Sequence, residues 1–228
     1  MTANRTIKSF VLRQGKITSG QLKAINELMP IYGIKFQESL LSSNLFYTHS
    51  RPLIIEIGFG MGTATWQIAK NNPQNEYLGI EVHGPGVGTL LMSIVQNEVT
   101  NLKLIQHDAV EVLKKMVPDN TITGFHIYFP DPWHKTKHHK RRLIQNEFVN
   151  LLVTKLKIGG YIHFATDWEH YAMWALNIFR QNNLLQNQSQ TNDFIPRPEF
   201  RPLTKFEMRG LKLGHGIWDL MFIKMDGP

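Results

Sequence analysis

Short apolar runs alternate with amphipathic stretches along most of this chain of 228 residues. The apolar runs predict β-strands at residues 53–57, 77–80, 102–106, 125–129, 161–165 and 217–224. Between the first four runs, the spacing of apolar residues predicts helices at residues 63–71, 90–99 and 110–116. Alternation of this kind is typical of a mainly parallel sheet that is covered on both faces.

Two more helices are expected on either side of the fifth run. Residues 144–156 carry apolar side chains spaced mostly by three or four, and Gly159-Gly160 is expected to stop that helix. A later helix passes through Trp174 and Phe179, and residues 186–192 are expected to form a polar loop. The run at residues 217–224 is expected to pair antiparallel at the C-terminal end. The pattern therefore predicts an α/β fold with a doubly wound, mainly parallel sheet.

The length suits one domain with a substantial core, so we expect residues 1–228 to form a single domain. Residues 1–26 contain five Lys or Arg and no acid, and residues 1–45 are expected to form a basic N-terminal arm. The net charge of +7 and the pI near 9.6 favour a polyanionic partner. The chain has no cysteine, which excludes disulfides and thiolate zinc sites. No apolar leader and no long apolar run are visible, so we expect a cytoplasmic protein without membrane contact.

Acidic residues follow four of the predicted strands, at the edge where doubly wound sheets bind ligands. The first strand leads into the turn Glu56-Ile57-Gly58-Phe59-Gly60-Met61-Gly62, in which glycines allow the backbone to approach a ligand closely. Glu81 ends the second strand, Asp108 follows the third and Asp131 follows the fourth. Any one of these acids could simply cap a helix. Four of them at one edge favour a ligand site.

The glycine-rich turn argues against a dinucleotide and for S-adenosylmethionine. A dinucleotide site would show G-x-G-x-x-G, whereas this turn is one residue tighter and opens with an acid. An acid repels a pyrophosphate but attracts an amino group or a sulfonium. The ribose diol suits Glu81 as a hydrogen-bond acceptor, and the adenine amino group suits Asp108.

Asp131 lies between two prolines, which stiffen the turn around it. The following segment, residues 134–142, carries five Lys or Arg, three His and no acid, and nucleic acid is its first candidate partner. Arg141 and Arg142 are expected to open the next helix, where the helix dipole disfavours cations and RNA phosphates would explain them. The alternatives are a solvated loop and a metal site at His134, His138 and His139, which the absence of an acid argues against.

Several motifs together resemble the bacterial tRNA (guanine-N7-)-methyltransferase family. They are the turn from Glu56 to Gly62, Pro130-Asp131-Pro132-Trp133-His134-Lys135, Thr166-Asp167-Trp168 and Thr204-Lys205-Phe206-Glu207. Residues 8–16 also resemble the opening of that family, with Lys16 where arginine is usual. The resemblance covers nearly the whole chain. It implies a class I methyltransferase fold with a seven-stranded sheet, and methyl transfer from S-adenosylmethionine to N7 of guanosine 46 in the variable loop of tRNA.

The resemblance also implies roles for individual residues. Glu56, Gly58, Gly60, Glu81, Asp108 and Asp131 would bind S-adenosylmethionine, and Asp131 would also be catalytic. Guanosine or other parts of the tRNA would contact Lys135, Lys137, His138, His139, Lys140, Arg141, Arg142, Asp167, Thr204, Lys205, Phe206 and Glu207. The expected partner is tRNA, no metal is implied, and the chain would act as a monomer or homodimer.

Some residues keep a second interpretation at this stage. Trp133 could stack on a flipped guanine or be buried in the core. Asp167 could cap a helix, and Thr204 with Glu207 has the spacing of a capping box. The rival functions are an amino-methyltransferase of adenine or cytosine, and an RNA-binding protein that has lost catalysis.

Overall fold

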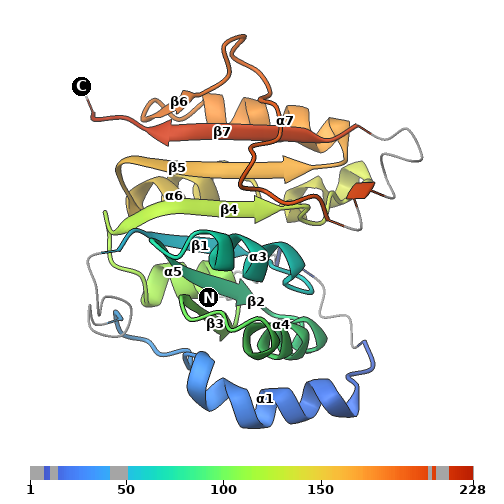
Figure 1. The fold of residues 1–228 in the computed structure, drawn as a ribbon. Coiled ribbons are helices and arrows are strands. Elements are labelled where there is room, and N and C mark those ends of the chain that lie inside the picture. The colour runs from blue at the N-terminus through green and yellow to red at the C-terminus, as the bar shows by residue number, and fades with distance from the viewer. Residues whose placement is uncertain (1–7, 11–14, 42–50, 205–206, 209–215, 228) are drawn as a thin grey trace, which may run out of the picture.

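The protein forms a seven-stranded sheet in the strand order β3-β2-β1-β4-β5-β7-β6 (Figure 1). The computed structural model describes residues 8–10, 15–41, 51–204, 207–208 and 216–227. The strands are β1 (Leu53–Ile57), β2 (Glu76–Glu81), β3 (Leu102–Gln106), β4 (Ile122–Tyr128), β5 (Leu156–Thr166), β6 (Leu185–Asn187) and β7 (Trp218–Lys224). Strands β1 to β5 are parallel, and β7 pairs antiparallel with both β5 and β6. The predicted fold class and the antiparallel last strand are confirmed.

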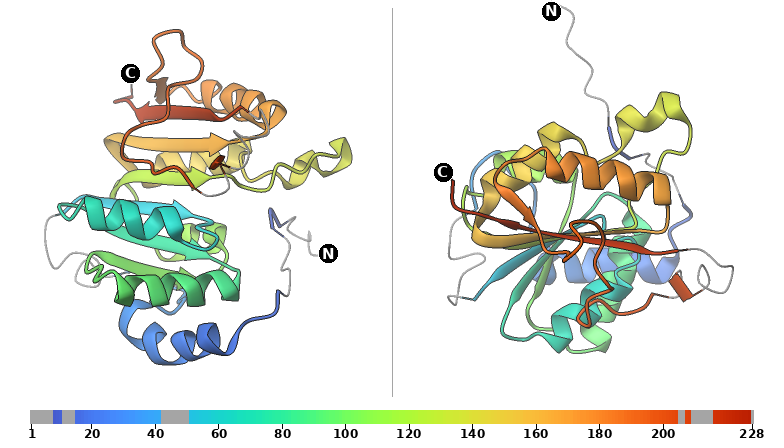
Figure 2. Two further views of the ribbon diagram at one scale, coloured as in Figure 1. Left: turned by 45° about the vertical axis from the view of Figure 1, so that its right-hand side comes forward. Right: turned by 90° about the horizontal axis from the view of Figure 1, so that it is seen from above.

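Helices cover both faces of this sheet (Figure 2). One face packs against α5 (Ala109–Lys115), α6 (Asn146–Lys155) and α7 (Glu169–Arg180). The other packs against α3 (Thr63–Asn71) and α4 (Gly84–Gln96), with α1 (Ser19–Tyr32) outside α4. Every residue of β1 is buried, as expected for a central strand between two helical layers. In the described part of the chain, no helix has the length and apolar character needed to cross a bilayer.

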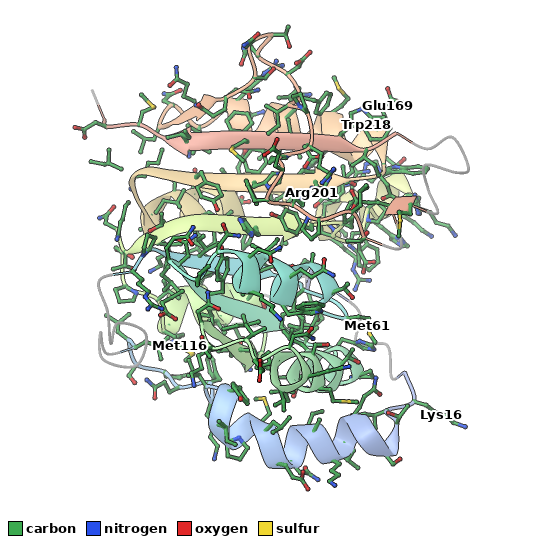
Figure 3. The ribbon with its side chains drawn as sticks, viewed as in Figure 1. Lys16, Met61, Met116, Glu169, Arg201 and Trp218 are labelled. Atoms are coloured by element: carbon green, nitrogen blue, oxygen red, sulfur yellow. The ribbon has the colours of Figure 1, made fainter. Side chains whose placement is uncertain are left out.

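The strand order creates a switch point between β1 and β4. From β1 the chain moves outward to β2 and β3, and then returns to β4 on the other side of β1. The loops after β1 and β4 therefore diverge, and the space between them is where ligands bind in this type of sheet. Glu169 and Met61 lie at this edge of the sheet, away from Met116 (Figure 3).

Helix α4 begins earlier than predicted because its glycines serve packing. The segment Gly84-Pro85-Gly86 looks like a loop, but proline is tolerated in the first helical turn. A Cβ atom at Gly86 would lie 2.0 Å from the carbonyl oxygen of Gly60. The predicted end at residue 99 was also wrong, since the helix ends at Gln96.

Two predicted features of the C-terminal half were wrong. Helix α6 ends at Lys155, and Gly159-Gly160 lies inside β5, near an irregularity in its pairing with β4, where glycine is common. The expected polar loop at residues 186–192 overlaps the short edge strand β6. Its three residues are too few to show the alternation that identifies a strand.

The expected N-terminal arm contains a helix that was not predicted. Thr18 caps α1, and the amide of Gln21 donates to the Thr89 hydroxyl of α4 at 3.0 Å. Thr18 and Gln21 also form a capping box at the start of α1. This part of the arm is therefore an ordered layer on the sheet.

Candidate active site

A cavity of about 270 Å³ opens at the switch point, between the ends of β1, β2, β3 and β4. Its lining includes five residues that the sequence predicted as ligand contacts: Gly58, Gly60, Glu81, Asp108 and Asp131. It also includes Ser9 and Phe10, for which the sequence carries no sign of ligand contact. Residues from six separate segments thus meet at the predicted edge.

The glycine-rich turn leaves room for a ligand against its backbone. Gly58 and Gly60 have φ angles of 73° and 57°, which side-chain-bearing residues rarely adopt. A Cβ atom at either position would meet no protein atom within 4 Å, so it would extend into free space. These two glycines therefore form a cradle that a side chain would fill.

Glu81 is held rigidly at the mouth of the cavity. One carboxylate oxygen accepts the backbone N–H of Gly60 at 2.8 Å. The other accepts the N–H groups of Val82 and His83 at 2.7 and 3.0 Å. Each carboxylate oxygen has about two acceptor positions, so Glu81 can still accept from a ligand hydroxyl.

Glu56 lies behind the turn and does not line the cavity. It is 4% exposed in the buried strand β1. Burial raises the pKa of Glu56 to about 8, the neighbouring Thr65 hydroxyl opposes this rise, and the carboxylate of Glu81 adds to it. Glu56 is therefore protonated at neutral pH unless a positive charge binds nearby.

Asp108 has a structural role and also lines the cavity. Its carboxylate accepts the backbone N–H of Val110 at 3.0 Å and caps α5. The capping interpretation is thus correct for Asp108, and the cavity position is compatible with a ligand contact as well.

The loop that carries Asp131 is held in an unusual backbone conformation. Phe129 and Trp133, on either side of Pro130-Asp131-Pro132, have φ angles of 51° and 47°. Such conformations cost about 1–3 kcal/mol each and persist only where surrounding contacts enforce them. The carboxylate of Asp131 is exposed and lines the cavity. The loop is therefore stiff, as the two prolines suggested.

Arg142 holds this loop from inside, which contradicts its predicted contact with RNA. It is 1% exposed, and its Nε donates to the Pro132 carbonyl at 2.9 Å. Its Nη2 donates to Nδ1 of His170 at 3.1 Å, and the guanidinium lies against the rings of Tyr171 and Trp174. A guanidinium buried in this way cannot present its charge to a phosphate.

The rest of the basic segment forms a 3₁₀ helix, η1 (Thr136–Arg141), which projects beside the cavity edge. Lys135, Lys137 and Lys140 are exposed, while His138 and His139 are partly buried. The prediction that Arg141 and Arg142 open the next helix was wrong, because α6 begins at Asn146. Cations at the C-terminal turn of η1 are compatible with the helix dipole.

Comparisons with known proteins identify the family. A family model described as "Putative methyltransferase" matches residues 50–220. The tRNA (guanine-N(7)-)-methyltransferase of Chromobacterium violaceum is 54% identical over 218 residues, which are 96% of each chain. That of Methylobacillus flagellatus is 53% identical over 221 residues, which are 96% of this chain and 92% of the relative.

The chain belongs to the tRNA (guanine-N7-)-methyltransferase family. Among solved structures, the 16S rRNA methyltransferase KamB has the same fold, with a TM-score of 0.59 at 11% identity. That match covers 83% of this chain and all of KamB. The resemblance seen in the sequence motifs is confirmed.

Trp133 is part of the motif that indicated the family, and its side chain contacts other residues of the protein. Its Nε1 donates to the Ser9 carbonyl at 3.1 Å, and the Arg141 guanidinium lies 4.1 Å from the centre of its ring. Trp133 is partly buried and joins two loops, so it is not a core residue, and its stacking on guanine stays a prediction. An exposed aromatic residue of the family motifs is instead Trp168, which is 40% exposed and contacts the ring of His134.

Asp167 follows β5 at the same edge, but it does not cap α7. The N-cap position is Trp168, and no side chain caps that helix. Among the described residues, the Asp167 carboxylate makes no hydrogen bond. It is half-buried, and its contact with the substrate stays a prediction.

Thr204 and Glu207 form the capping box that their spacing predicted. The Glu207 N–H donates to the Thr204 hydroxyl at 3.1 Å, and the Thr204 N–H donates to the Glu207 carboxylate at 2.9 Å. Glu207 is 1% exposed and also receives a hydrogen bond from Arg201. A carboxylate engaged in this way is unsuited to a direct substrate contact. Lys205 and Phe206 lie outside the described residues.

Proposed function

We propose that this protein methylates N7 of guanosine 46 in the variable loop of cytoplasmic tRNA, with S-adenosylmethionine as the methyl donor. The single observation that carries the activity is membership of the tRNA (guanine-N7-)-methyltransferase family over nearly the whole chain. The position of the guanosine and the role of each residue are the proposed parts.

The cavity fits the methyl donor. The glycine cradle provides space against the backbone, and the carboxylates of Glu81 and Asp108 are acceptors for a ribose diol and an amino group. Acids rather than cations surround the turn, which suits a positively charged ligand and not a pyrophosphate. We therefore assign Gly58, Gly60, Glu81 and Asp108 to cofactor binding.

The chemistry needs positioning more than proton transfer. S-adenosylmethionine supplies an electrophilic methyl group on a positively charged sulfur, and guanine N7 has a lone pair and no proton. The purine becomes cationic as the reaction proceeds, so a fixed negative charge beside it lowers the barrier. Asp131 provides such a charge on a stiff loop between the cavity and the exposed edge, and we assign it the catalytic role.

The rest of the tRNA would lie along the exposed cations of the basic segment. Lys135, Lys137 and Lys140 project into solvent beside the loop of Asp131. Together with the net charge of +7, they provide a surface for phosphates. Asp167, which follows β5, and Thr204, which opens the capping box with Glu207, would contact the guanosine.

A methylation assay tests this proposal. The protein is incubated with unmodified tRNA and labelled S-adenosylmethionine, and the modified tRNA is then cleaved at 7-methylguanosine and sequenced at the break. We expect one break, in the variable loop. Methylation on an exocyclic amino group of adenine or cytosine would contradict the proposed reaction, and a break at another guanosine would contradict only the position.

A further inference from the structure

A buried cluster of charged side chains joins the loop before β7 to the sheet. Arg201 is 1% exposed, and its Nε and Nη2 donate to the two carboxylate oxygens of Asp219 at 2.9 and 2.8 Å. Its Nη1 donates to Oε1 of Glu207 at 2.5 Å, while Oε2 of Glu207 accepts the N–H of Thr204. Arg201 therefore holds strand β7 and the turn that begins at Thr204 at the same time.

The cluster continues to the end of β4. Nε2 of His163 lies 2.7 Å from Oδ1 of Asp219, and Nδ1 lies 3.0 Å from the Tyr128 hydroxyl. Burial lowers the pKa of His163, although Asp219 opposes the shift, so the ring is neutral. Nε2–H then donates to Asp219, and Nδ1 accepts from the Tyr128 O–H. Tyr128 is the last residue of β4, three residues before Asp131.

Arg201 also contacts the start of the loop that carries Asp131. Its guanidinium carbon lies 5.8 Å from the ring centre of Tyr128 and 5.5 Å from that of Phe129. The loop that carries it crosses over the middle of the sheet (Figure 3). One side chain thus touches both the Asp131 loop and the partner of Thr204.

We propose that Arg201 is a positioning residue for methyl transfer. It fixes the position of Thr204 relative to the Asp131 loop, so that guanine is held between them. The inference rests on the proposed contact of Thr204 with guanosine. The Thr204 hydroxyl accepts the Glu207 N–H and keeps its own proton, which can be donated to an acceptor on guanine such as O6. Arg201 itself touches no substrate, because all three of its nitrogens are engaged inside the protein.

Arginine suits this position because two carboxylates must be bound in one plane. Its guanidinium provides a fixed fork to Asp219 and a third donor to Glu207. Lysine would keep the charge but could not hold both acids in the same geometry. Arg201→Lys therefore keeps the positive charge but loses the geometry that fixes Thr204 relative to the Asp131 loop.

The test measures single-turnover methylation of tRNA with tRNA and cofactor both saturating, together with cofactor affinity by calorimetry. We expect Arg201→Met to slow the transfer by about 10²-fold, since a displacement of about 1 Å in a reacting pair has an effect of that size. Arg201→Lys and Asp219→Asn should slow it by about 10-fold or more. Cofactor affinity should fall by much less than the transfer rate, because neither residue lines the cavity and Arg201 reaches its lining through Phe129.

Lys224→Met is the matched control. Lys224 is a buried cation in β7, at the opposite end of that strand from Asp219. Its Nζ donates to Asn120 Oδ1 and to the Leu156 carbonyl, both at 2.8 Å. Lys224→Met should lower the melting temperature, because two hydrogen bonds of a buried side chain are lost. The saturated transfer rate of the folded protein should remain that of the parent.

Three results would overturn the inference. They are a parent-like saturated rate in Arg201→Lys and Asp219→Asn, an equal loss of cofactor affinity and transfer rate, and an equal loss of rate in Lys224→Met. If Arg201→Met does not fold, the two milder variants decide. Failure of the proposed function is seen separately, since the parent protein would then yield no 7-methylguanosine.

Discussion

Glu56 is an acid inside a buried strand, and its protonation links stability to pH. Its pKa is raised from 4.5 to about 8 by burial, so between these values the folded state binds more protons than the unfolded state. The contribution of Glu56 to the free energy of unfolding of the cofactor-free protein should therefore fall as pH rises from about 4.5 to about 8. Each unit by which the pKa differs between the folded and unfolded states corresponds to about 1.4 kcal/mol in the free energy of unfolding. Urea denaturation of the parent and of Glu56→Gln at pH 5 and pH 9 measures this contribution.

Glu56→Gln should remove this dependence. The amide has nearly the same shape and no charge, so the variant should match the parent near pH 5 and exceed its stability at pH 9. Glu76, a partly exposed acid at the start of β2, offers a control as Glu76→Gln, for which no such gain is expected. Equal pH slopes in parent and Glu56→Gln would show that Glu56 is ionised in the folded protein.

Asp131 should matter for rate and not for folding. Asp131→Asn keeps the shape of the loop and removes the charge that faces the developing purine cation. Loss of one such electrostatic interaction typically costs about 10²-fold or more in rate. The carboxylate is exposed, so the melting temperature should change little. Single-turnover methylation with tRNA and cofactor saturating isolates this step, and a parent-like rate would assign catalysis to positioning alone.

At the scale of single residues, the sequence predicted where the acids lie but not which charges face inward. Glu81, Asp108 and Asp131 were predicted because parallel strands bring their carboxyl ends to one edge. Arg142 was misassigned because an arginine in a basic run carries no local sign of burial. His163 and Asp219 did carry a sign, since each is a polar residue inside an apolar strand and such residues are usually paired.

The exposed lysines in and next to the 3₁₀ helix η1 should make tRNA binding depend on salt concentration. Replacing Lys135, Lys137 and Lys140 with Ala should weaken tRNA binding, and each phosphate that is no longer bound should lower the salt slope by about 0.7–0.9. The slope is obtained from binding measurements over a series of salt concentrations. Arg142 is left in place because its replacement would disturb the Asp131 loop.

Three exposed lysines remote from the cavity edge provide the control for this element. Lys70 and Lys114 lie in the last turns of α3 and α5, and Lys157 lies near the start of β5. The corresponding triple Ala variant has the same net charge but should keep the parent slope. Equal slopes in both triple variants would make the effect one of net charge and not of η1.

Close packing between α4 and the glycine-rich turn leads to a further prediction at this scale. In Gly86→Ala the new Cβ would clash with the Gly60 carbonyl, so we expect weaker cofactor binding and a stability loss of about 1–3 kcal/mol. A Cβ atom at Gly20 in α1 would have no neighbour within 4 Å, so Gly20→Ala should be neutral or stabilising. Thermal unfolding with and without cofactor compares the two. If Gly86→Ala bound cofactor as tightly as the parent, α4 would have moved to make room for the new Cβ atom without disturbing the glycine-rich turn.

The elements themselves were predictable where packing agrees with local pattern. Strand β1 and helix α3 were located correctly because their apolar spacing and burial coincide. The prediction for α4 missed its first turns because Gly86 serves contact with a distant turn, which no local pattern records. The same limit applies to α1, whose contact with α4 joins segments about 70 residues apart.

Across the whole molecule, segments far apart in the sequence combine to line the cavity. Residues 8–10 lie against the loop after β4, where Trp133 Nε1 donates to the Ser9 carbonyl. Arg141 donates from Nε to the Lys8 carbonyl and from Nη2 to the Phe10 carbonyl, both at 3.4 Å. Since Ser9 and Phe10 line the cavity, the basic segment supports the cofactor site through this contact.

Arg141→Ala should therefore weaken cofactor binding, although Arg141 does not line the cavity. Removing two long, partly exposed hydrogen bonds and the contact with Trp133 should reduce affinity by roughly 10-fold, because each such bond contributes about 1 kcal/mol or less. Lys140→Ala removes an adjacent, exposed cation and should bind cofactor as the parent does. Calorimetric titration of S-adenosylmethionine into the tRNA-free protein compares the two variants. Equal affinities would mean that residues 8–10 line the cavity without contributing to cofactor binding.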